Sequence, residues 1–292
     1  MRSLVLARVG SRSLHPCWID RGRDRDWDLY LSPYEPIPPQ GDLDCEVGEV
    51  IRGPKLAGIR TLLQRWDGWR DYDHVWLPDD DIYATQDTIS SMFGVARGAG
   101  LDLFAPALHE SSYFAHFSTM RNTSFFARWV GFVEIMIPAF STSALEELAP
   151  TIDESATGWG WGLDSVWPKL LDYENVGIID ALPVIHTRPV GAMRDLELAA
   201  RVHAESDALL ERYACRQLHA TFGAFGPDLR PLDLSPESLL AELVEGYRYL
   251  IRQDPRVLSW IMYFQRPQAS WPDYPTEGTP EAVPVAAPVP VA

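Results

Sequence analysis

The stretch DYDHVWLPDDDIYAT, residues 71–85, places a short apolar run directly before three consecutive aspartates. The run from His74 to Leu77 is typical of a buried strand. Three adjacent carboxylates repel one another and are costly to bury, so a partner must compensate for their charge. Ligands of α/β sheets bind beyond the carboxyl ends of the strands. The stretch therefore predicts aspartates that face a ligand cleft.

Strands and helices alternate around this stretch. Apolar runs predict strands over 3–9, 27–34 and 101–108, and apolar residues at helical spacing predict helices over 55–66 and 84–100. This alternation is typical of an α/β domain with a mostly parallel sheet.

The second half of the chain continues with strands and then helices. We expect an apolar strand over 132–141 and two short strands within 176–189. A charged helical pattern extends over about 194–220, and a second helix over 235–253 begins with a Ser-Pro-Glu cap signal.

These patterns divide the chain into three parts. Residues 1–192 are expected to form the α/β domain, and residues 193–271 a helical extension packed on it. Residues 272–292 are rich in proline and alanine, a composition that is typical of a disordered tail.

The formal charge of −16 excludes nucleic acid as a partner bound through the overall field, because phosphate backbones need a basic surface. A phosphorylated small molecule would need a local source of positive charge, either a metal ion or a few basic side chains. Hydrophobic residues make up 46% of the chain, which is enough for a sizeable core.

Three widely spaced cysteines without a Cys-x-x-Cys pair indicate free thiols in a reducing compartment. The first ten residues read as a strand and not as a signal peptide. No run reaches the roughly 18–20 apolar residues of a membrane span. We therefore expect no transmembrane segment and a cytoplasmic location.

The three aspartates are the first candidate site. On an extended segment Asp79 and Asp81 share one face while Asp80 points elsewhere. Two converging carboxylates suit Mg²⁺ or Mn²⁺, which can also hold a diphosphate. The alternative is a solvated acidic turn that caps the next helix.

The second candidate site is the segment GWGWGLD, residues 158–164. Glycines such as Gly160 permit unusual backbone angles and close ligand approach, and the faces of Trp159 and Trp161 suit a sugar ring. Asp164 near a helix N-terminus is favoured as an anion and is a candidate general base. The alternative is an aromatic turn with Asp164 as its N-cap.

Three further residues have two interpretations each. His186 ends a strand and is either a third metal ligand or a structural histidine. Arg188 contacts phosphate or is a surface charge. Glu134 interrupts an apolar run, where it binds an acceptor hydroxyl or pairs with an arginine such as Arg128.

Taken in order, four segments resemble a known family. They are YDHVWLPDDDI, FVEIMIPAFS, GWGWGLD and VGIIDALPVIH. The family is a domain of unknown function whose plant members carry the label "lysine-ketoglutarate reductase trans-splicing related". The resemblance extends from about residue 3 to Gly191.

That family in turn is similar to nucleotide-sugar glycosyltransferases of the GT-A type. This resemblance implies a Rossmann-like α/β/α sandwich with an Asp-x-Asp motif at a strand end, which Asp79-Asp80-Asp81 matches. It also implies that His186 completes the metal site. The segment GWGWGLD is similar to the Gly-Trp-Gly-Gly-Glu-Asp segment of β-1,4-galactosyltransferases, which implies an acceptor-lining Trp161 and a base at Asp164. One of the two acids of that segment is missing here.

The first hypothesis is an inverting, metal-dependent glycosyltransferase that moves a sugar from a nucleotide-diphosphate donor to a hydroxyl of a carbohydrate or glycoconjugate. Its catalytic base is Asp164, and the ligands of Mn²⁺ or Mg²⁺ are Asp79, Asp81 and His186. The expected donor-binding residues are Asp79, Asp80, Lys55 and Arg60. The expected acceptor-binding residues are Trp159, Gly160, Trp161 and Glu134. The alternatives are a metal-dependent hydrolase of phosphoesters or nucleotide sugars, and an inactive module that binds nucleotide sugars.

Overall fold

A computed structural model describes residues 2–190 and 195–266. Its helices are α1 (Lys55–Arg65), α2 (Gln86–Ala99), α3 (Thr142–Leu148), α4 (Leu163–Leu170), α5 (Leu196–Arg212), α6 (Pro236–Gly246), α7 (Arg248–Gln253) and α8 (Arg256–Phe264). Its strands are β1 (Ser3–Val9), β2 (Trp27–Pro33), β3 (Glu46–Val47), β4 (His74–Trp76), β5 (Ile82–Tyr83), β6 (Leu103–Leu108), β7 (Ala127–Val130), β8 (Ala139–Ser141), β9 (Val176–His186) and β10 (Thr221–Phe225). The predicted tail, 272–292, lies outside the described residues.

The central sheet has the strand order β10-β7-β9-β6-β8-β4-β1-β2-β3. The pairings β1–β2, β1–β4, β2–β3 and β6–β9 are parallel. Strand β8 is antiparallel to β4 and β6, and β7 is antiparallel to β9 and β10. Along this path only β7 and β8 run against the common direction, so the predicted mostly parallel sheet is confirmed.

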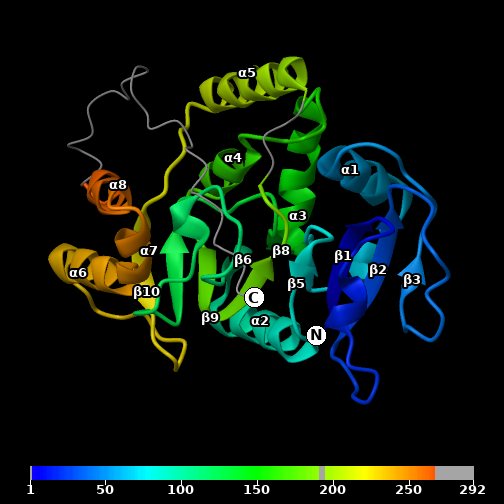
Figure 1. Cartoon of the computed structure of the whole chain (residues 1–292), viewed down its shortest axis with the longest axis horizontal. Helices are drawn as coiled ribbons and strands as arrows, with labels where there is room; N and C mark the ends of the chain where they lie inside the picture. The colour runs from blue at the N-terminus through cyan, green and yellow to red at the C-terminus, as the bar shows by residue number, and fades with distance from the viewer. Residues whose placement is uncertain (1, 191–194, 267–292) are drawn as a thin grey trace.

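Helices cover both faces of this sheet (Figure 1). Side chains alternate between the faces along β1, so Ser3 and Arg8 lie on opposite sides. The Ser3 hydroxyl accepts a hydrogen bond from Arg97 of α2 at 3.1 Å. A Cβ atom at Gly58 of α1 would lie 2.3 Å from the Arg8 guanidinium carbon. Helices α1 and α2 therefore pack on opposite faces, as in an α/β sandwich.

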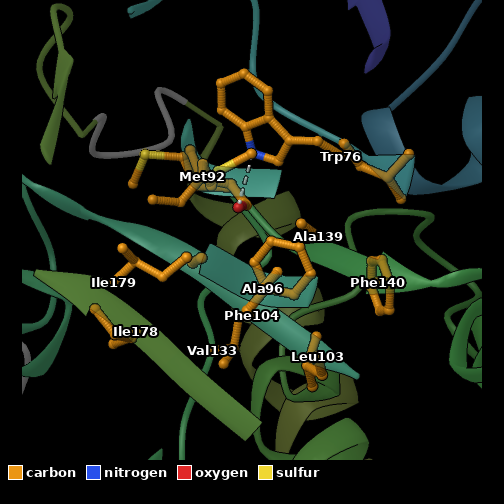
Figure 2. Packing of buried hydrophobic residues seen from close by; sticks show 14 of the residues in the cluster. Trp76, Met92, Ala96, Leu103, Phe104, Val133, Ala139, Phe140, Ile178 and Ile179 are labelled. Carbon is orange, nitrogen blue, oxygen red and sulfur yellow. Dashed lines mark hydrogen bonds between the residues drawn. The ribbon is translucent and has the colours of Figure 1, made fainter. Parts of the chain in front are cut away.

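The core between α2 and the sheet is built around Trp76, which is fully buried (Figure 2). Its indole N–H donates to the main-chain carbonyl of Ile137 at 3.1 Å. Met92, Phe104 and Ile179 gather in the same packed layer (Figure 2). Burial of such large side chains contributes about 1.5–3 kcal/mol each to folding. The run before the aspartates is thus held in the core.

The predicted strand over 132–141 is wrong for most of its length, because only Ala139–Ser141 is a strand. Residues 131–138 form a buried loop whose main-chain groups bond elsewhere. Met136 accepts from the Asp79 amide at 2.9 Å, and Pro138 accepts from the Leu77 amide at 2.8 Å. An apolar run cannot by itself separate a buried loop from a strand when tertiary contacts satisfy its backbone.

Two further boundaries differ from expectation. Residues 176–186 form one strand with a register irregularity against β6, where two short strands were predicted. The helix predicted over 235–253 is divided into α6 and α7 at Tyr247. The cap signal at its start is confirmed, since the Ser235 side chain accepts from the Ser238 amide at 3.2 Å.

The part of the chain after residue 192 contributes more than helices. Strand β10 pairs with β7 at one edge of the sheet, beside α6, α7 and α8 (Figure 1). The two predicted units therefore share one sheet. No helix in the described part of the chain is long and apolar enough to span a membrane.

Candidate functional site

The three aspartates follow β4 at the carboxyl end of the sheet. Short strand β5 comes directly after them and pairs with the end of β9, so that Ile82 lies opposite His186. This pairing brings Asp81 next to His186, although the two are far apart in the sequence. The predicted position of the aspartates beyond the strand ends is confirmed.

Asp80 joins three neighbouring segments. Its carboxylate accepts hydrogen bonds from the Gly10 amide at 3.1 Å and the Tyr34 hydroxyl at 2.9 Å. Arg188 donates to the same carboxylate at 3.1 Å, so Arg188 is paired and not a free surface charge. Since Gly10 and Tyr34 directly follow β1 and β2, Asp80 fixes the aspartate segment to the carboxyl end of the sheet.

Asp79 is paired with Lys55, the first residue of α1. The Lys55 ammonium lies 2.6 Å from Asp79 Oδ1 and also donates to the main-chain carbonyls of Ile135 and Met136 at 2.8 and 2.7 Å. Burial lowers the pKa of Lys55 and raises that of Asp79, and the ion pair between them opposes both shifts. Both residues are expected at the site from the sequence, but no local pattern indicates the bond between them.

Asp81 faces His186 at 3.4 Å, from carboxylate Oδ2 to imidazole Nε2. Burial favours the neutral form of both groups, but their mutual interaction outweighs it. It raises the pKa of His186 above its usual value and, together with the charge of Arg188, lowers that of Asp81. Nδ1 of His186 lies 2.9 Å from the Tyr113 carbonyl, which can only accept, so Nδ1 donates to that carbonyl and Nε2 is directed at Asp81.

Asp79, Asp81 and His186 meet some of the requirements of a divalent-cation site. In the described ranges no group of three or more histidine, cysteine or acidic side chains is arranged as a ready metal site. However, Asp81 Oδ1 is buried without a hydrogen-bond partner, and an imidazole nitrogen faces the same carboxylate. Carboxylate oxygens and imidazole nitrogen are suitable ligands for a divalent ion. Asp81 and His186 thus offer ligands that fit such an ion, whereas Asp79 is held by Lys55.

A second pair of carboxyl groups lies beside the first. Glu134 and Asp164 are 7% and 6% exposed, and the Val133 amide donates to the main-chain carbonyl of Asp164 at 3.3 Å. Burial raises the pKa of Glu134 to about 8, and the neighbouring Asp164 adds to this shift. Burial also raises the pKa of Asp164 to about 7, although hydrogen bonds from Ser165 oppose it. An acid with a pKa near neutrality is suited to proton transfer.

Glu134 was predicted either to bind an acceptor or to pair with Arg128. The pairing is wrong, because Arg128 forms a buried ion pair with Asp180 at 2.8 Å. Oε2 of Glu134 is buried and has no hydrogen-bond partner. A second carboxyl group beside Asp164 thus comes from the loop 131–138, which no local motif indicates.

The glycine-rich segment is a tight loop between α1 and α5. Gly158, Gly160 and Gly162 all have positive φ, and a Cβ at Gly160 would lie 2.1 Å from a methyl carbon of Leu56. Trp159 is 39% exposed, whereas Trp161 packs edge-on against His203 of α5 at 5.0 Å between ring centroids. Of the two tryptophans, Trp159 offers the more open face.

Helix α5 supports this loop through a residue that the sequence pattern did not single out. The Glu205 carboxylate accepts hydrogen bonds from the Thr157 amide at 2.7 Å and its hydroxyl at 2.8 Å, and also from the Ser155 hydroxyl. A carboxylate on a charged helix face gives no signal of such a contact. Helix α5 is thus part of the frame that positions Asp164.

Arg60 was predicted to contact donor phosphates. It instead forms an ion pair with Asp153 at 2.7 Å, at the contact between α1 and the short helix Ala149–Glu154. This arginine is therefore engaged in packing α1.

Comparisons with known proteins give only distant similarities. No family model and no curated protein matches the chain. A crystal structure of residues 1–349 of TarS from S. aureus in complex with UDP-GlcNAc has 11% identity and a TM-score of 0.43, covering 89% of this chain and 74% of that chain. A longer TarS structure, of which this chain spans 42%, has 10% identity and a TM-score of 0.42 over 73% of this chain. A 4-diphosphocytidyl-2C-methyl-D-erythritol synthase from Anaerococcus prevotii has 12% identity and a TM-score of 0.37, covering 70% of this chain and 95% of that chain. Similarities this weak leave the functional assignment to the site residues.

Proposed function

We propose that the protein is an inverting, metal-dependent glycosyltransferase that uses a nucleotide-diphosphate sugar as donor and a carbohydrate hydroxyl as acceptor. The observation that carries this proposal is that two pairs of acidic residues with different surroundings lie in one site. Asp79 and Asp81 form ion pairs with Lys55 and His186, whereas burial raises the pKa of Glu134 to about 8 and that of Asp164 to about 7.

The first group is the donor side. Asp79, Asp81 and His186 would hold Mn²⁺ or Mg²⁺, which neutralises the donor diphosphate when it is bound and makes it a better leaving group. Asp80 keeps this segment at the strand ends through Gly10 and Tyr34. In a chain with a formal charge of −16, such local positive charge is what a diphosphate needs.

The second group is the acceptor side. Asp164 removes the proton from the acceptor hydroxyl, whose oxygen forms the new bond to the anomeric carbon. The bond from that carbon to the diphosphate oxygen breaks, and the nucleoside diphosphate leaves with its electron pair. Glu134 remains protonated near neutral pH and can donate a hydrogen bond to the acceptor. The open face of Trp159 is suited to stacking on the acceptor sugar.

The proposal is tested by thermal-shift titration with UDP, GDP, CDP and their sugars, with and without Mn²⁺. A ligand that binds only the folded protein raises its unfolding temperature. We expect one nucleotide to give an Mn²⁺-dependent shift that Asp81→Asn abolishes and that Asp164→Asn retains. The bound donor is then incubated with a panel of glycoside acceptors. Nucleotide release that no acceptor accelerates would contradict transfer and indicate a hydrolase.

A further inference from the structure

The Lys55 ammonium already occupies a small oxygen cage. Its three N–H donors are matched by three oxygens, from the Asp79 carboxylate and from the Ile135 and Met136 carbonyls, at 2.6–2.8 Å. Its side chain is only 18% exposed. Lys55 therefore fills a cation position between the aspartate segment and the loop 131–138.

The Lys55 ammonium is bonded to the Asp79 carboxylate, which a divalent ion at this site would also need. A carboxylate oxygen bonded to an ammonium at 2.6 Å cannot at the same time coordinate a metal without losing that bond. The Asp79 side chain is 36% exposed, so solvent can reach it. Two residues further along the chain, Oδ1 of Asp81 is buried and has no hydrogen-bond partner. A divalent ion that used Asp79 would therefore have to displace Lys55 from it.

We propose that Lys55 competes with the divalent cation for Asp79, so that the metal binds strongly only when a nucleotide diphosphate takes over the lysine. This inference rests on the proposed function, because it concerns the donor side of that site. The diphosphate oxygens offer the ammonium a replacement for the Asp79 carboxylate. Lys55 then moves from an aspartate partner to a phosphate partner.

The first experiment compares Mn²⁺ binding without nucleotide, from the free Mn²⁺ signal in electron paramagnetic resonance. Lys55→Met removes the charge and keeps an unbranched side chain. The matched control is Lys169→Met, since Lys169 on α4 is the only other lysine in the sequence. We expect Lys55→Met to bind Mn²⁺ about tenfold more tightly than the wild type, and the control to be unchanged. Equal or weaker binding by Lys55→Met would overturn the inference.

The second experiment uses the unmodified protein, so it does not depend on the variant folding. With two lysines, selective ¹³Cε labelling gives two lysine signals, and Lys169→Met assigns them. Mg²⁺ is added with UDP, GDP or CDP, whichever raises the unfolding temperature. We expect the Lys55 signal to move on joint addition, more than with nucleotide or Mg²⁺ alone, and the Lys169 signal to stay. A Lys55 signal that does not respond to the bound pair would refute the exchange.

The two proposals fail in different ways. If no nucleotide binds under any condition, the proposed function fails, while Mn²⁺ binding by Lys55→Met still decides the competition. If a nucleotide binds without metal and the Mn²⁺ titrations of wild type and Lys55→Met coincide, the competition is refuted. The metal dependence of the proposed function would then fail as well, and the acceptor assay would decide whether transfer from a nucleotide sugar occurs without a metal.

Discussion

Glu134 has a pKa of about 8 because its carboxyl group is buried and lies beside the carboxylate of Asp164. Asp164 has a pKa of about 7, so it loses its proton first as the pH rises. If Asp164 is the base, the transfer rate falls about tenfold per pH unit below about 7. The measurement is kcat/KM for the donor between pH 5 and 9. A profile that stays flat from pH 5 to 8 would exclude Asp164 as the titrating base.

Glu134 also makes the free energy of unfolding depend on pH. Its folded pKa lies above the ordinary value of 4.5, so its protonated form is the one that the folded state favours. This stabilisation is complete below about pH 4.5 and is lost as the pH rises through about 8, at about 1.4 kcal/mol per unit of pKa difference. We expect Glu134→Gln to be more stable than the wild type at pH 8, by on the order of a few kcal/mol, and similar at pH 4.5. Urea unfolding measures this, with exposed Glu147→Gln as the control.

Replacement of the proposed base separates binding from chemistry. Asp164→Asn keeps the size of the side chain but cannot accept the acceptor proton, so transfer is expected to fall by about 10²–10⁴-fold. Donor binding, followed by thermal shift, should remain within about twofold because the donor side is untouched. Asp172→Asn, an exposed turn residue just after α4, is the control. Normal transfer by Asp164→Asn would remove this residue from the base role.

The glycine loop gives a paired test of backbone geometry. Gly160 has φ 77° and no room for a Cβ atom, because the Leu56 methyl carbon lies 2.1 Å from that position. Gly160→Ala should therefore destabilise the protein by about 1–3 kcal/mol and slow transfer. Gly94 lies in α2, and apart from its chain neighbours and the backbone of that helix no atom lies within 4 Å of its Cβ position. Gly94→Ala should therefore stabilise the protein by up to about 1 kcal/mol. Thermal unfolding and transfer assays of both variants make the comparison, and equal effects would contradict it.

Two ion pairs that differ in burial should differ in how much each stabilises the folded protein. Arg128 and Asp180 are 1% and 0% exposed, whereas Arg60 and Asp153 are 21% and 52% exposed. Arg128→Met leaves a buried carboxylate unpaired and should cost about 3–5 kcal/mol. Arg60→Met should cost about 0–1 kcal/mol. Chemical denaturation measures both, and a loss of under 1 kcal/mol for Arg128→Met would show that Asp180 is neutral in the fold.

Much of the first hundred residues could be predicted from the sequence, because strands and helices there follow simple periodic patterns. The expected strand over 3–9 agrees with β1, and the expected helix over 84–100 agrees with α2 to within two residues. The position of the three aspartates followed from their place after an apolar run. In each case the local pattern and the packing favour the same structure.

The rest depended on contacts between distant segments. Glu134 was assigned to a strand because its neighbours are apolar, yet the loop around it is held by Lys55 and by the chain at Leu77–Asp79. The hydrogen bond that the Thr157 amide donates to Glu205 joins residues 48 apart in the sequence. Neither periodicity nor a short motif encodes such a pairing, since each residue alone looks like an ordinary charge in its segment.

The pairing of β10 with β7 also bears on how the chain is synthesised. The antiparallel edge of β7 stays open until residues 221–225 have left the ribosome, long after β1 to β9 have emerged. An unpaired strand edge is a template for association with other chains. A nascent chain stalled before residue 221 would therefore be expected to depend on chaperones, whereas one stalled after α8 would not.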